Sequence, residues 1–216
     1  MNNVDSPPAI LKRPRRRWRK LRCALLALLG LVVLAYLFVT GPRDLGRYPP
    51  GATSPYRLPW PAGRMILCSQ SNRGIVSHRD FEEFAYDFSM PVGSDVCAAR
   101  AGQVKRIVID HDGHGLHMPN NLIAIDHGDG TTGWYLHLQK DGAVVKLGQR
   151  VRQGEVIARS GHVGRSLAPH LHFHVTDDAQ HHTVPISFSD VSRQRGVPRM
   201  LFFYTSGNTR MEEGAY

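Results

Sequence analysis

Three histidines at alternate positions are the residues of this sequence best suited to chemistry. They lie in residues 169–175, where His170, His172 and His174 alternate with apolar side chains. Successive side chains of a β-strand point to opposite faces, so the three histidines are expected to share one face while their neighbours enter a core. Imidazole is a frequent zinc ligand and proton carrier. The segment therefore predicts a metal site on a rigid sheet, and the alternative is a polar strand face that is merely rich in histidine.

Further candidate residues lie in separate segments upstream. His78 follows Ser77, Asp87 lies in the apolar run 84–91, and His137 lies in Trp-Tyr-Leu-His-Leu at 134–138. Burying a charge without a partner costs on the order of several kcal/mol of folding free energy. Asp87 lies in an apolar run that is expected to be buried, so a cation partner is expected for it. Each segment alone is a weak signal, whereas the order His, Asp, Tyr-x-His and His-x-His is specific.

In that order the segments resemble the lysostaphin-type (LytM-type) zinc metallopeptidases, a family of peptidoglycan endopeptidases. The resemblance runs over residues 77–175. It implies one Zn2+ ion per chain, held by His78, Asp87 and His172. It also implies that His137 and His170 are unliganded catalytic histidines, with His170 as general base and His137 as proton donor. Such a site holds three protein ligands and one open position for water, which suits hydrolysis.

Two positions depart from the usual pattern of the family. His78 precedes Asp87 by nine residues, more than in the shorter family pattern, so residues 79–84 are expected to loop out. His174 stands where the family often has a glutamate. It either orients His172 from behind or faces solvent.

The elements that must position these residues are predicted to be β-strands. Short apolar runs separated by glycine turns indicate strands, and no amphipathic helix of ten or more residues is evident in this part. The expected strands cover residues 104–109, 121–126, 132–138, 156–160 and 171–176. The fold class is therefore all-β, an antiparallel folded sheet or sandwich. Residues 146–161 resemble the hairpin of lipoyl-carrier domains but lack the lysine that carriers modify.

The N-terminal part predicts a single membrane anchor. A basic run ends at Arg22, and residues 23–40 are free of charged side chains. Eighteen residues make a helix of about 27 Å, close to the hydrocarbon thickness of about 30 Å. Basic residues before the span would keep that end in the cytoplasm. A cleaved signal peptide is the alternative, although no small-residue cleavage site follows the apolar run.

These patterns divide the chain into five regions. They are a basic cytoplasmic N-terminus at 1–22, a transmembrane anchor at 23–40, a Pro/Gly-rich spacer at 41–62, a zinc peptidase domain at 63–190 and a C-terminal extension at 191–216. The proline density of the third region favours an extended spacer. The last region is expected to add an edge strand and a frayed tail.

Charge and cysteine content narrow the possible partners. Residues 1–40 hold eight lysines and arginines against one aspartate, so they carry +7 of the net charge of +9. The remainder is nearly balanced, which argues against nucleic-acid binding. Cys68 and Cys97 could form a disulfide in an oxidising compartment, or they are two buried thiols.

Together these features predict a membrane-anchored zinc metalloendopeptidase that cuts cross-links or stems of peptidoglycan. It would sit in the bacterial cytoplasmic membrane by one N-terminal helix, with its catalytic domain in the periplasm. One alternative is a catalytically silent module that activates another cell-wall hydrolase. Another is a zinc hydrolase that acts on a different substrate, for example a secreted protein or a pro-peptide. The bond cut and any protein partners stay open.

Overall fold

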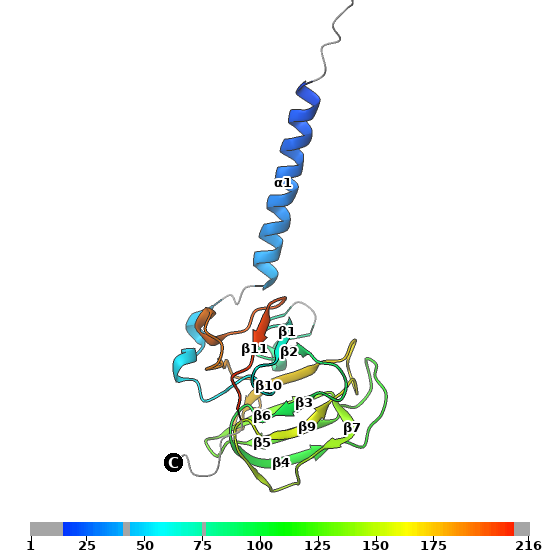
Figure 1. Ribbon diagram of the computed structural model, residues 1–216, viewed down its shortest axis with the longest axis vertical. Helices are drawn as coiled ribbons and strands as arrows, with labels where there is room; N and C mark the ends of the chain where they lie inside the picture. The colour runs from blue at the N-terminus through cyan, green and yellow to red at the C-terminus, as the bar shows by residue number, and fades with distance from the viewer. Residues whose placement is uncertain (1–14, 41–43, 75–76, 210–216) are drawn as a thin grey trace, which may run out of the picture. The chain divides into compact units, whose positions relative to one another are not determined.

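The computed structural model describes residues 15–40, 44–74 and 77–209, without the side chains of 15–17 and 37–40. The chain divides into two compact units, Met1–Phe38 and Val39–Tyr216. The first described element is helix α1 (Arg15–Thr40), drawn in blue in Figure 1.

The membrane anchor expected at residues 23–40 is not supported. Among the residues that the structure describes, no helix is both long and apolar enough to cross a membrane. The described side chains of α1 include those of Arg19, Lys20 and Arg22, and residues 37–40 lie outside the described side chains.

The described part of the second unit forms two antiparallel sheets (Figure 1). The larger has the order β11 (Phe203–Thr205), β1 (Met65–Gln70), β2 (Tyr86–Ser89), β10 (Leu171–Asp177), β6 (Thr131–Leu136), β5 (Leu122–Asp126), β4 (Gly102–Val108) and β8 (Arg150–Val151). The smaller has the order β3 (Asp95–Cys97), β9 (Val156–Ser160) and β7 (Leu138–Ala143). Short 3-10 helices are η1 (Leu45–Arg47), η2 (Gly51–Thr53), η3 (Asp80–Glu82) and η4 (Gln194–Gly196). The prediction of an antiparallel all-β fold is confirmed.

Strand β10 shows why the chain folds this way. Its alternate residues Leu171, Phe173 and Val175 are fully buried in the core. Burial of each such side chain contributes about 1.5–3 kcal/mol, which fixes the register because a shift of one residue would turn all three outward. β10 pairs with β2 on one side and β6 on the other, so the histidine face lies between two neighbouring strands.

The proline-rich segment before β1 packs into the domain instead of standing free as an extended spacer. Tyr56, Leu58 and Trp60 are buried in the core, and the Trp60 and Phe88 ring centroids lie 4.8 Å apart. Proline keeps this segment out of the sheet ladder but leaves its neighbours free to bury large side chains. The free energy of burying these aromatic rings outweighs the stiffness of the backbone.

The C-terminal part supplies the edge strand that the sequence predicts. β11 pairs antiparallel with β1, and the expected frayed tail at residues 210–216 lies outside the described residues. Of the two alternatives left open for Cys68 and Cys97, the structure has the pair of buried thiols, because both cysteines are free and lie on strands of different sheets. Burial raises the pKa of Cys97 to about 12 and the pKa of Cys68 well above its usual value, which makes both thiols unreactive.

Candidate metal centre

The pairing of β2 with β10 brings Asp87 opposite His172. The two residues are direct partners in the antiparallel register, so their side chains leave the sheet on the same face. His170 comes one residue before β10 begins and lies beside them. The metal site predicted from residues 169–175 therefore lies on a strand whose other face anchors it in the core.

His78 reaches the same place from a loop. It is fully buried, and its Nδ1 donates to the backbone carbonyl of Ser71 at 2.9 Å. The residues between His78 and Asp87 include η3, so this segment loops out as the nine-residue spacing requires. The unusual spacing thus still brings His78 to Asp87.

His137 stands where the chain passes from the larger sheet to the smaller one. It follows the last residue of β6 and precedes the first residue of β7. Its φ angle of 63° lies in the left-handed region, which a β-sheet ladder does not use and which costs about 1–3 kcal/mol in a residue with a side chain. This corner directs the imidazole toward His170, with ring centroids 4.5 Å apart.

One carboxylate oxygen is the centre of the cluster. Asp87 Oδ1 lies 2.8 Å from His172 Nδ1, 3.1 Å from His78 Nε2 and 3.6 Å from His170 Nε2. His78, Asp87 and His172 are buried, and their ligand atoms all lie within 4.8 Å of one another. Among the described residues this is the group of histidine, cysteine and acidic side chains that could hold a metal ion.

The hydrogen bonds of the two histidine ligands fit a metal ion. His78 donates through Nδ1, so in the neutral ring Nε2 carries a lone pair; it is buried without a hydrogen-bond partner and faces the carboxylate. Two acceptors face each other there, which is favourable only with a cation between them. His172 Nε2 lies 3.0 Å from His174 Nδ1, and His172 Nδ1 lies 2.8 Å from Asp87 Oδ1. With its proton on Nε2, His172 donates to His174, and Nδ1 would then be available to a metal in place of its hydrogen bond to Asp87. Metal-bound histidines usually donate their second nitrogen in this way.

The supporting role predicted for His174 agrees with this contact. Its side chain is buried rather than solvated and stacks against Trp134 at 6.2 Å between ring centroids. Burial and the neighbouring His172 hold the pKa of His174 well below its usual value. A neutral His174 accepts a hydrogen bond from His172 Nε2 without adding positive charge to the site.

The carboxylate of Asp87 is ionised in this setting. Burial alone would raise its pKa, but the attraction of His78 and the hydrogen bond from His172 outweigh burial and hold the pKa well below its usual range. A permanently charged carboxylate between imidazoles is the donor set of hydrolytic zinc sites. The residues present therefore fit a zinc ion.

The two remaining histidines share a different arrangement. His137 donates through Nδ1 to the carbonyl of Val163 at 2.9 Å, and His170 donates through Nδ1 to the carbonyl of Ala168 at 2.7 Å. Each ring thereby keeps an unprotonated Nε2. Burial and the neighbouring histidines lower the pKa of His137 to about 3, and burial also lowers the pKa of His170. Both rings are neutral at pH 7 and able to accept a proton.

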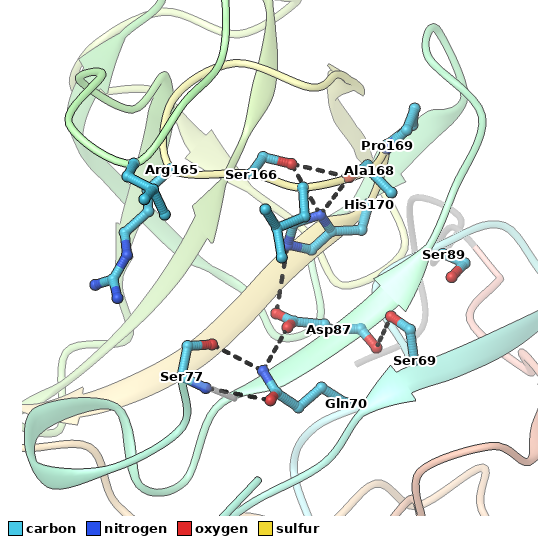
Figure 2. Close-up of a pocket in the computed structure, with 12 residues that line it drawn as sticks. Ser69, Gln70, Ser77, Asp87, Ser89, Arg165, Ser166, Ala168, Pro169 and His170 are labelled. Atoms are coloured by element: carbon cyan, nitrogen blue, oxygen red, sulfur yellow. Dashed lines mark hydrogen bonds and ion pairs between the residues drawn. The ribbon is translucent and has the colours of Figure 1, made fainter. Parts of the chain in front are cut away.

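A pocket of about 400 Å3 opens beside these residues (Figure 2). Asp87 and His170 lie in its wall, and Ser69, Ser77 and Ser89 add hydroxyl groups. The pocket gives a substrate access to the carboxylate and to one catalytic candidate. The structure thus brings all five predicted site residues together, and two of them, Asp87 and His170, line the pocket.

Sequence reasoning missed two residues at the end of β1. Gln70 Nε2 donates to Asp87 Oδ2 at 2.9 Å and to Ser77 Oγ at 2.8 Å (Figure 2). Ser71 provides the carbonyl that orients His78. No sequence motif marks them: the pairing of β1 with β2 places Gln70 opposite Asp87, and the loop that carries His78 returns to Ser71.

Replacing Gln70 with leucine is expected to weaken zinc binding about 10–100-fold, the usual effect of losing a group that orients a ligand. The substitution removes the donor to Asp87 Oδ2, so the carboxylate can rotate its Oδ1 away from the two histidines. Competition titration with a zinc chelator measures the affinity. Gln103→Leu on β4 is the matched control, since Gln103 bonds only to the backbone carbonyl of Gly148 outside the site. Equal affinities for both variants would contradict this role.

Several known proteins are similar in sequence to this part of the chain. Residues 82–184 match the model described as Peptidase family M23. Glycyl-glycine endopeptidase ALE-1 of Staphylococcus capitis is 40% identical over 91 residues, which cover 42% of this chain and 23% of that protein. Peptidoglycan DD-endopeptidase ShyB of Vibrio cholerae is 37% identical over 114 residues, which cover 50% of this chain and 25% of that protein.

A solved structure is similar to the same region. The catalytic domain of lysostaphin from Staphylococcus simulans aligns with a TM-score of 0.41 and 28% sequence identity, covering 53% of this chain and 80% of that one. This chain spans only about a quarter of the length of the two curated relatives, since 23% and 25% of them are covered.

Proposed function

We propose that this protein is a zinc endopeptidase that hydrolyses peptide bonds of peptidoglycan, a proposal supported by the match of residues 82–184 to peptidase family M23. The observation that carries the proposal is the buried group of His78, Asp87 and His172, whose ligand atoms lie within 4.8 Å of one another and in which His78 Nε2 has no hydrogen-bond partner. Relatives named as peptidoglycan endopeptidases support the substrate class. The β-domain would work outside the cytoplasmic membrane, because peptidoglycan lies there.

His78, Asp87 and His172 would hold the ion. A zinc ion bound there would supply a Lewis acid and lower the pKa of a water molecule, the usual chemistry of hydrolytic zinc. His170 accepts the proton of the attacking water at Nε2, while the carbonyl of Ala168 fixes its ring through Nδ1. His170 lines the pocket beside Asp87, its Nε2 3.6 Å from Asp87 Oδ1.

His137 completes the proton transfer. In the resting site its Nε2 carries no proton, so it donates only after it has received one. The His170 ring is its neighbour, 4.5 Å away between centroids, and is the proposed source of that proton. The low pKa of about 3 means that His137 gives the proton up readily to the leaving amine, which needs one to depart.

Digestion of isolated peptidoglycan by the full chain tests the proposal. The zinc-loaded protein is expected to release peptides that mass spectrometry identifies as products of endopeptidase cleavage, and chelation of zinc should stop the release. Unrelated folded proteins incubated in parallel should stay intact. A protein that binds zinc but releases no wall peptide would contradict the proposed activity and favour the regulatory module instead.

A further inference from the structure

An arginine stands in the pocket beside the candidate catalytic histidine. Arg165 lines the same cavity of about 400 Å3 as Asp87 and His170. In Figure 2 it lies on the side of the pocket opposite Ser69 and Ser89. It is the one lysine or arginine among the described residues that line this cavity.

The backbone holds Arg165 in a defined place. Its N–H donates to Asn120 Oδ1 at 3.0 Å, and the preceding residue, Gly164, donates to the carbonyl of Gly113 at 3.0 Å. Gly164 has a φ angle of 90°, and a Cβ there would meet Asn120 Oδ1 at 1.9 Å, so only glycine allows this close approach. Two loops distant in sequence are thereby locked together, and Arg165 projects from a fixed base.

The guanidinium of Arg165 has no partner within the described part of the chain. Other arginines of the domain form ion pairs, such as Arg100 with Asp129 at 2.7 Å and Arg73 with Glu83 at 2.8 Å. The one carboxylate lining the pocket, Asp87, is already engaged by the histidines and Gln70. A positive charge with five donors therefore lines the pocket, and no acidic side chain among the described residues pairs with it.

Exposed apolar side chains line the same pocket. Leu116 and Leu167 are 66% and 81% exposed, and both line the cavity together with Pro169. Exposed leucines beside a cavity gain free energy when an apolar part of a ligand covers them. A ligand that contacts both the leucines and Arg165 would carry small apolar groups and an anionic group.

We infer that Arg165 binds a carboxylate of the peptide substrate, which makes it a specificity-determining residue. The substrate class is then a peptide with a free carboxylate near the scissile bond, as cross-linked stem peptides have, rather than an uncharged glycine bridge. A guanidinium binds a carboxylate through two parallel hydrogen bonds, so it reads both charge and geometry. This inference rests on the proposed endopeptidase function and narrows its substrate.

Steady-state cleavage of three synthetic peptides by the zinc-loaded full chain tests the inference. The first is a cross-linked stem-peptide dimer with free carboxylates, the second is the same dimer with its carboxylates amidated, and the third is pentaglycine. The wild-type protein is expected to prefer the first over the second at least about tenfold in kcat/KM, the effect of one charge-assisted hydrogen-bonded pair. Pentaglycine should be the poorest substrate.

Variants assign the preference to the residue. Arg165→Gln is expected to lower kcat/KM on the free-carboxylate dimer about tenfold more than on its amide, mainly by raising KM. Arg165→Lys should restore part of this difference, because lysine keeps the positive charge but lacks the paired donors of the guanidinium group. Arg106→Gln, at an exposed position of β4 outside the pocket, controls for net charge and should keep the wild-type preference.

The outcomes separate this inference from the proposed function. Cleavage of the amide or of pentaglycine as well as the free acid by the wild-type protein would overturn the inference while leaving the endopeptidase activity intact. An equal loss on acid and amide in Arg165→Gln would overturn it too. No cleavage of any wall peptide by zinc-loaded protein would overturn both. The wild-type comparison needs no variant, so it decides the question even if a substituted protein fails to fold.

Discussion

Replacing Asp87 with asparagine is expected to remove bound zinc and to lower kcat/KM on wall peptides by about a thousandfold or more, the effect of losing several kcal/mol of transition-state stabilisation. Asp87 Oδ1 is the atom on which His78, His170 and His172 converge. An amide oxygen carries no charge to bind the ion and to balance the imidazoles. Elemental analysis of the purified protein gives zinc per chain, and peptide cleavage gives the rate.

Asp141→Asn is the matched control for this result. Asp141 is exposed on β7 and has a φ angle of 55°, a conformation that asparagine tolerates well. This variant should keep one zinc per chain and full activity. Retention of stoichiometric zinc by Asp87→Asn would show that the ion is bound elsewhere, and the assigned ligand set would be wrong.

Replacing His170 with alanine is expected to separate catalysis from metal binding. Zinc should stay at one ion per chain, because His170 is outside the ligand group of His78, Asp87 and His172. The kcat on wall peptides should fall by about a hundred- to ten-thousandfold, the usual contribution of a positioned general base. Zinc content and single-turnover kinetics of the loaded protein measure the two effects.

His117→Ala tests whether any loss is specific. His117 is an exposed histidine in a loop outside the pocket lining, so its removal should leave both zinc and rate unchanged. If His170→Ala loses its zinc together with its activity, His170 is a ligand rather than a base. Activity close to wild type would instead remove His170 from the mechanism.

The strands of this fold are predictable from local sequence patterns. Period-two alternation in residues 171–175 predicts both the strand and the side that faces the core, and Leu171, Phe173 and Val175 are buried as expected. The glycine-bounded apolar runs likewise become β4, β5, β6, β9 and β10 with ends shifted by only one or two residues. These features depend on neighbours in the chain, so a short window contains them.

The candidate site is predictable only in part. The motif order points to His78, Asp87 and His172, and the cross-strand register of β2 and β10 explains why the last two meet. Gln70 escapes sequence reasoning because its contact with Asp87 is created by strand pairing and not by spacing. Arg165 escapes it for the same reason, since the pocket that surrounds its side chain is built from several loops.

Contacts between distant segments are the part that the sequence does not reveal. Proline density in the segment before β1 predicts a stiff linker, yet Trp60 packs against Phe88 in the core. Composition reports the backbone preference of a segment but not where its aromatic side chains go. The two cysteines illustrate the same limit, because an oxidising compartment permits a bridge only where the strands bring the sulfur atoms together.

The burial of Trp60 and the pairing of β11 with β1 have a practical meaning for anyone who excises the catalytic portion. A fragment trimmed to residues 82–184, the family match, would lose the indole that covers Phe88 and the strand that carries Gln70. Such a fragment would expose the apolar surface that Trp60 covers, and Asp87 would lose its hydrogen bond from Gln70. The folded domain is therefore wider than residues 82–184, and the segments on both sides of that match contribute to its core and to the site.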